Sequence, residues 1–201
     1  MKLNKEIFRE YDIRGIWEKD IDEEISYHIG RAFATKLLSY GKDTMIVGYD
    51  NRISSKTIEE NLVKGLTDSG VNVVRLGLVT TPMYYYAWDK LNIKCGIMVT
   101  ASHNPKEHNG YKVYDDTGCQ LLPEAADQVV QYVNEVEDEL NIKVFSDEEA
   151  YPYMTWIGEE VDEAYYKEVM AIEVNPGMDK SDFKIVFSPQ HGTSNIAVRT
   201  C

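Results

Sequence analysis

The chain has 201 residues, and its 34 acidic against 21 basic side chains give a formal net charge of -13 at pH 7. This length is enough for one α/β domain and part of a second. The negative charge repels phosphate backbones and anionic membrane surfaces, so we expect neither nucleic acid nor a membrane as a partner.

The first half of the chain alternates helical and extended patterns. Apolar residues at helical spacing predict a helix within residues 21–40, which Gly41 ends. A strand, a helix, a strand, a helix and a strand are then expected at 44–50, 54–69, 71–77, 82–91 and 94–100. This alternation predicts an α/β fold with a mixed, mostly parallel sheet and helices on both faces.

The segment 110–122 has a different pattern from the segments before it. Alternating residues around the turn sequence at 115–118 predict a hairpin or an antiparallel edge strand. Pro123 then opens a predicted acidic helix that extends to about residue 140. Because a polar segment follows, we assign residues 1–155 to a first domain and residues 156–201 to the incomplete start of a second, similar α/β domain.

The second domain is expected to contain a helix from Glu159 and the strand FKIVFSP at 183–189. One helix and one strand cannot bury a core of their own, so we expect the chain to be a fragment of a longer protein. An uncovered apolar strand is a template for pairing with another chain. We therefore expect either self-association through residues 159–201 or disorder there.

Cysteine usage and the start of the chain bear on the compartment. Cys95, Cys119 and Cys201 have neither CxxC nor metal-ligand spacing, and the opening residues contain no apolar signal-peptide region. A reducing compartment fits this pattern best, so we expect a cytoplasmic protein.

The segment VTASHNP at residues 99–105 follows a predicted strand of the sheet, where open parallel sheets bind ligands. Ser102 there can act as a nucleophile or carry a phosphoryl group if a base and positive charge are close. His103 and Lys112 are candidate partners, and Asn104 can bind phosphoryl oxygens. Each residue alone also has an ordinary interpretation, as a turn former, a solvated loop histidine or an outward-facing lysine.

Longer strings around this segment carry a family resemblance. TASHNP followed by NGYKVY resembles the active-site serine loop of the α-D-phosphohexomutases, the phosphoglucomutase and phosphomannomutase superfamily. FREYDIRG (8–15), GYDNRISS (48–55) and VTTP (79–82) are similar to other loops of the family's first domain. SPQHGTSN (188–195) resembles the first loop of its second domain, in the form of the phosphoglucomutase branch, which favours glucose as the sugar.

The resemblance implies an isomerase that interconverts hexose 1-phosphate and hexose 6-phosphate. The reaction passes through a phosphoserine and a hexose 1,6-bisphosphate, which also serves as activator. The implied catalytic residues are the phosphoserine, a general acid or base and the histidine beside the phosphoserine: Ser102, Lys112 and His103. The implied phosphate- and substrate-binding residues are Arg14, Asn104 and His191.

The resemblance also implies Mg²⁺, with one ligand supplied by the phosphate on Ser102. The family's other metal ligands are aspartates of a DGDGDR-like loop, and this sequence contains no such loop. We therefore expect the isolated chain to be inactive in turnover. The competing hypothesis is that the chain is a non-catalytic remnant or binding module.

Other polar and aromatic residues have structural interpretations. Asp50 and Arg52 are expected to tie their turn together as an ion pair, and Ser54 or Ser55 is expected to cap the following helix. The aromatic run at 84–88 lies on a predicted helix, where some of its rings must pack inside. We interpret this run as core and not as a sugar platform.

Overall fold

A computed structural model describes residues 4–9, 12–120, 124, 127, 131 and 144–201. The predicted helix from Pro123 to about residue 140 therefore lies outside the described residues, apart from three single positions. None of the described helices is both long enough and apolar enough to cross a membrane.

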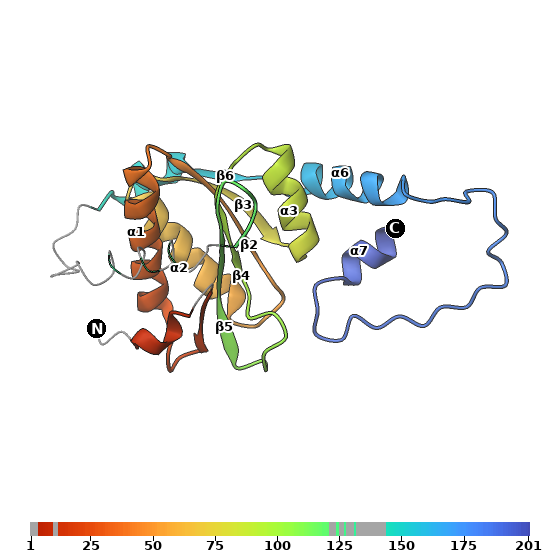
Figure 1. Cartoon of the computed structure of the whole chain (residues 1–201), viewed down its shortest axis with the longest axis horizontal. Coiled ribbons are helices and arrows are strands. Elements are labelled where there is room, and N and C mark those ends of the chain that lie inside the picture. The colour runs from red at the N-terminus through yellow and green to blue at the C-terminus, as the bar shows by residue number, and fades with distance from the viewer. Residues whose placement is uncertain (1–3, 10–11, 121–123, 125–126, 128–130, 132–143) are drawn as a thin grey trace.

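Strands and helices alternate through most of the described chain (Figure 1). The elements in chain order are η1 Lys5–Ile7, β1 Ile13–Ile16, α1 Glu23–Ser39, β2 Thr44–Tyr49, α2 Ser55–Asp68, β3 Asn72–Leu78, α3 Thr81–Lys90, β4 Gly96–Val99, β5 His108–Tyr114, α5 Asp147–Ala150, η3 Tyr151–Tyr153, β6 Met154–Trp156, α6 Glu159–Met170 and α7 Asn195–Thr200. The helix and the five elements predicted between residues 21 and 100 are therefore confirmed, with small shifts of their ends.

The strands form one six-stranded sheet in the order β1-β5-β4-β2-β3-β6. β4, β2, β3 and β6 run parallel to one another, whereas β5 is antiparallel to both β1 and β4. This arrangement confirms the predicted mixed, mostly parallel sheet. The carboxyl ends of β2 and β4 lie next to each other, because these two strands are paired and parallel.

Helices cover both faces of this sheet, as predicted (Figure 1). Successive residues of a strand point to opposite faces, so Val47 and Ile97 join the buried cluster of α1 and α2. Ile46 and Met98 join a second cluster with α3 and α6. Tyr166 of α6 is buried in that second cluster, so this helix packs onto the sheet's α3 side.

Two features of the antiparallel end differ from the sequence prediction. The N-terminal arginine segment was expected to be a loop, but Arg14 lies on strand β1, which pairs with β5. The expectation of an edge strand at 110–122 is therefore wrong for β5, since β1 covers its outer side. A bridge from Tyr114 to Gln120 closes the turn, in agreement with the hairpin alternative, while residues 121 and 122 of its second arm lie outside the described residues.

The C-terminal residues from Glu159 confirm one prediction and correct another. The helix from Glu159 is confirmed as α6, but the expected strand at 183–189 does not form. A strand requires a hydrogen-bonded neighbour, and no described residue pairs with this segment. Figure 1 shows residues 171–194 as a long extended connection between α6 and α7. The side chains of Ile185 and Val186 are 84% and 100% exposed.

Candidate active site

Two loops meet at the carboxyl ends of β2 and β4. The loop after β2 carries Asp50 and Arg52, and the loop after β4 carries Ser102. Thr100 connects the two loops, because its hydroxyl donates to an Asp50 carboxylate oxygen at 2.8 Å and accepts from the Ser102 N–H at 2.9 Å. The position of Ser102 is thus coupled to the end of the neighbouring strand.

Ser102 has an exposed side chain on an unusual backbone. Its φ is 54°, in the left-handed region that residues with a Cβ seldom adopt. Its hydroxyl oxygen lies 3.4 Å from Nδ1 of His103, which is also exposed. Left-handed backbone at a serine persists only where the surrounding contacts hold it. The contacts therefore hold the backbone at Ser102, while its hydroxyl faces solvent.

Arg52 supplies several of those contacts. The predicted ion pair is confirmed, with Arg52 Nε 3.1 Å from an Asp50 carboxylate oxygen. The sequence did not indicate that the same guanidinium also donates to backbone carbonyls of the Ser102 loop. Two of these acceptors are the carbonyl oxygens of Ser102 and Asn104, at 2.9 and 3.0 Å.

The start of α2 corrects the capping prediction. Ser54 is the N-cap residue, but its side chain makes no cap hydrogen bond, because its backbone is helical where a capping serine is extended. The hydroxyls of Ser54 and Ser55 instead accept from the buried amide of Asn109, at 2.8 and 2.9 Å. These two serines therefore connect the start of α2 to the start of β5.

Arg14 and Lys112 lie on the same face of the antiparallel end. The Tyr111 hydroxyl donates a hydrogen bond to α1 at 2.8 Å, so the flanking residues Gly110 and Lys112 point away from α1. Arg14 is the cross-strand partner of Gly110, and its neighbour Ile13 belongs to the core under α1. Arg14 and Lys112 are therefore diagonal neighbours on the face opposite α1.

Arg14 reaches the Ser102 loop directly. Its guanidinium donates to the side-chain oxygen of Asn104 and pairs with the buried carboxylate of Asp12. Asp12 was not predicted as a site residue. On an extended segment, residues two apart lie on the same side, so its position before Arg14 could have indicated an ion pair with that arginine. The structure thus brings Arg14, Asn104 and the Ser102 loop together.

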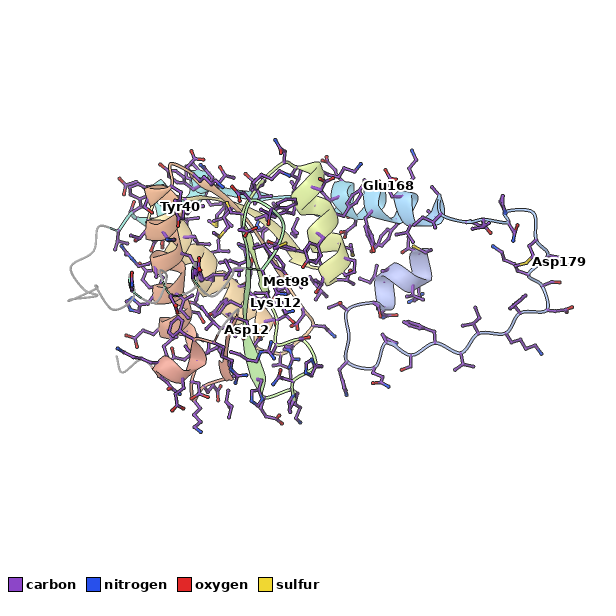
Figure 2. All side chains as sticks on the ribbon, viewed as in Figure 1. Asp12, Tyr40, Met98, Lys112, Glu168 and Asp179 are labelled. Atoms are coloured by element: carbon purple, nitrogen blue, oxygen red, sulfur yellow. The ribbon has the colours of Figure 1, made fainter. Side chains whose placement is uncertain are left out.

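Lys112 is half-buried on β5 beside Met98 of β4 (Figure 2). Its ammonium group makes no hydrogen bond or ion pair with any residue that the structure describes. A lysine on the Arg14 face without a carboxylate partner adds positive charge near the Ser102 loop in an otherwise acidic protein. Arg14 and Lys112 are thus two cations on this face.

Comparison with known proteins identifies the family. Residues 5–140 match the family described as phosphoglucomutase/phosphomannomutase, alpha/beta/alpha domain I. The chain belongs to this family. Its fold and the Ser102 loop at the carboxyl edge of the sheet agree with that assignment.

Relatives and solved structures of this family cover parts of the chain. A phosphomannomutase/phosphoglucomutase of Pseudomonas putida is 47% identical over 111 residues, which are 55% of this chain and 24% of that protein. A phosphoglucomutase of Staphylococcus saprophyticus is 35% identical over 157 residues, 75% of this chain and 28% of that protein. A family member from Burkholderia thailandensis superposes with a TM-score of 0.69 at 26% identity, covering 85% of this chain and 36% of that one. The chain spans about a quarter of these two curated relatives.

The family typically uses Mg²⁺, and the residues of this chain can be tested against such a site. The part of the chain that the structure describes holds no group of three or more His, Cys, Asp or Glu side chains placed to bind a metal. Two carboxylates linked to the Ser102 loop are already engaged, Asp12 by Arg14 and Asp50 by Arg52. The described residues therefore do not form a Mg²⁺ site by themselves.

The remaining predicted residues have simpler outcomes. His191 is exposed, and no hydrogen bond or ion pair links it to the other candidates or to any other described residue. In the aromatic run, Tyr84 is fully buried, and burial raises the pKa of its phenol well above the ordinary value. Its ring packs 4.9 Å from that of Tyr114, which confirms the core interpretation for Tyr84.

Proposed function

We propose that this chain supplies the phosphoserine part of a phosphoglucomutase/phosphomannomutase, in which Ser102 carries the phosphoryl group. The reaction interconverts hexose 1-phosphate and hexose 6-phosphate through a hexose 1,6-bisphosphate. One observation carries the proposal. An exposed Ser102 hydroxyl lies at the end of a parallel strand, on a loop that Arg14 contacts through Asn104.

The roles follow from what phosphoryl transfer needs. The reaction depends on positioning and on stabilising charge at the equatorial oxygens more than on covalent chemistry by the protein. Arg14 is placed to neutralise that charge, and Lys112 on the same face is suited to exchange a proton with the sugar hydroxyl. His103, within 3.4 Å of the Ser102 hydroxyl, is suited to assist proton movement at that oxygen.

Several features of the proposal concern the whole protein. Mg²⁺, when bound through the phosphate on Ser102, would neutralise charge on the transferred group. Because the described residues lack a site for it, we expect no turnover by this chain alone. We keep the proposed division into residues 1–155 and 156–201, a cytoplasmic location and hexose phosphates as substrates. Self-association through the exposed apolar residues after α6 belongs to the same proposal.

Transfer from a hexose bisphosphate tests the proposal. The dephosphorylated chain is incubated with glucose 1,6-bisphosphate, and intact mass is followed for a gain of roughly 80 Da, one phosphoryl group. Because the described residues form no Mg²⁺ site, we expect only a slow and partial gain over a long incubation. It should appear in the parent chain and in Ser181→Ala, which removes an exposed serine near the C-terminus, but not in Ser102→Ala. A gain that survives in Ser102→Ala, or no gain in any variant, favours the alternative of a non-catalytic binding module.

A further inference from the structure

Arg52 lies on the loop after β2, directly beside the loop that carries Ser102. An arginine has five N–H donors, which form a rigid planar fork. Each donor of Arg52 has its own acceptor: Asp50 Oδ2 at 3.1 Å from Nε, the carbonyls of Pro105 and His108 at 2.9 and 3.1 Å from Nη1, and those of Ser102 and Asn104 at 2.9 and 3.0 Å from Nη2. All five donors are therefore committed to the protein itself.

We infer that Arg52 is a positioning residue for Ser102 and does not bind substrate phosphate. Its guanidinium holds the loop in the conformation from which Ser102 carries a phosphoryl group, so this inference rests on the proposed function. A cation beside a phosphoryl site would ordinarily be assigned to the phosphate. The donor count opposes that assignment, because a phosphate oxygen could bind only by displacing a loop carbonyl.

Asp50 fixes the direction of the Arg52 fork. One carboxylate oxygen accepts from the Arg52 backbone N–H at 3.1 Å and from the Ser55 hydroxyl, and the other accepts from Arg52 Nε and from Thr100. The carboxylate is thereby tied to the start of α2 and to the end of β4. Arg52 is in turn held on a rigid frame, with its side chain only 13% exposed.

The contacts at Ser102 account for its left-handed backbone. Its carbonyl oxygen accepts from Arg52 and its N–H donates to Thr100, so both of its backbone polar groups are held from the protein side. Turning the loop carbonyls toward Arg52 also removes their partial negative charges from the side where a phosphoryl group would sit. The Ser102 hydroxyl is left exposed on that side.

Arg14 differs from Arg52 in the donors it has left. One N–H of its Nη1 contacts Asn104 and one N–H of its Nη2 contacts Asp12, so the second N–H of each nitrogen has no acceptor among the described residues. Arg14 therefore retains donors for phosphoryl oxygens, whereas Arg52 retains none. Arg14 is therefore suited to bind the phosphoryl group, whereas Arg52 holds the Ser102 loop in place.

Amide hydrogen exchange measured by NMR on the 201-residue chain tests the inference. The reporters are the N–H groups of Asn104 and His108, which donate within the loop to Ala101 and Pro105 at 3.0 Å each. Arg52→Lys keeps the charge but has three donors and no planar fork. We expect the reporters to exchange at least about tenfold faster in this variant, while amides of the β4–β5 ladder keep their rates.

Lys106→Met is the matched control, since Lys106 is an exposed cation in the same loop with no hydrogen bond or ion pair to any described residue. It should leave the reporters unchanged. Unchanged reporters in Arg52→Lys would overturn the inference. Equal acceleration of the ladder amides would also overturn it, because Arg52 would then serve the stability of the whole fold.

A titration with inorganic phosphate tests the second half of the inference. The Arg52 Nε–H resonance should not move as phosphate is added, and a saturable shift would show that Arg52 binds phosphate after all. The transfer assay with glucose 1,6-bisphosphate separates this inference from the proposed function. If Ser102 accepts no phosphoryl group while Arg52→Lys loosens the loop, the positioning role is supported and the phosphoryl role is contradicted.

Discussion

The sheet and the segment after α6 contain similar apolar runs, but only the run in the sheet forms a buried strand. Residues Gly96–Val99 form β4, which is buried between β2 and β5 with helices on both faces. Residues 183–187 (FKIVF) are also mostly apolar, with four apolar side chains among five residues. They nevertheless pair with no described strand, and Ile185 is 84% exposed. The comparison teaches that an apolar run becomes a strand only where neighbours accept its hydrogen bonds and cover its side chains.

The same difference separates the candidate site residues. Ser102 follows a buried strand, so its loop is tied to β2 by Thr100 and Arg52. His191 follows the unpaired run and has no comparable attachment within the described chain. A loop gains a fixed geometry from the strand before it, and the site is accordingly built where the sheet is complete.

The largest expected contrast lies between two ion pairs. Glu59 is fully buried and bonds Arg75 through two oxygens, at 2.8 and 2.5 Å, and the Trp156 ring lies 4.1 Å from that guanidinium. Glu59→Gln leaves Arg75 buried and unpaired, so we expect a loss of about 3–5 kcal/mol in the free energy of unfolding. Urea unfolding measures it.

The matched variant is Glu173→Gln, which removes the exposed pair with Lys180 after α6. An exposed pair contributes about 0–1 kcal/mol. If both variants lose a comparable amount of unfolding free energy, the sheet and the segment after α6 do not differ in how strongly they bury their ion pairs.

Two isoleucines give the next contrast. Ile97 of β4 is fully buried, and Ile97→Ala should lower the free energy of unfolding by about 2–5 kcal/mol through lost burial and the cavity left behind. Ile185→Ala should change it by less than about 0.5 kcal/mol, because this side chain is already in water. A large effect of Ile185→Ala in urea unfolding would mean that the run is covered in solution.

The cysteines give a contrast in reactivity. Burial raises the pKa of the Cys95 thiol to about 11, whereas Cys119 and Cys201 are exposed. At pH 8 only about 0.1% of Cys95 would be thiolate, the reactive form. We expect iodoacetamide to modify Cys95 at least roughly a hundredfold more slowly than the exposed pair, as read by peptide mass. Equal rates would indicate that β4 opens as readily as the C-terminal residues.

The smallest expected effect concerns self-association. Exposed apolar residues after α6, among them Phe183 and Val186, offer an unpaired backbone to a second chain. Sedimentation should show a weak, concentration-dependent increase in mass, which Val186→Lys reduces by placing a charge in the run. A concentrated sample that stays monomeric, with the amides of 183–187 protected from exchange, would contradict this expectation.

The sequence predicted the helix and the strands with clear apolar patterns well, and the strands without such patterns poorly. Helical spacing and the Gly41 stop were enough for α1, and apolar runs between turn residues were enough for β2 and β4. β1 (IRGI) and β6 (MTW) are short and their apolar residues are interrupted by polar ones or glycine, so neither gives an apolar run, and they exist because β5 and β3 offer free edges. The strand predicted at 183–189 was wrong for the opposite reason. Its apolar pattern was clear, but no described strand lies beside it to accept its hydrogen bonds.

The candidate site was predictable only in part, for similar reasons. Ser102, His103 and Asn104 are contiguous, so a motif finds them together. The pairing of Arg14 with Asn104 depends on the β1–β5 register, and the carbonyls bound by Arg52 depend on the path of a loop. Both arise from tertiary structure, and no local pattern encodes them.

The central claim is that Ser102 carries a phosphoryl group, and the most direct measurement is its modification in protein isolated from cells. Peptide mapping by mass spectrometry, with phosphatase inhibitors present during purification, should find a subpopulation heavier by roughly 80 Da. Fragmentation should locate the added mass on Ser102 and not on the neighbouring Thr100. Protein that is wholly unmodified at Ser102, or modified instead at other serines, would contradict the account.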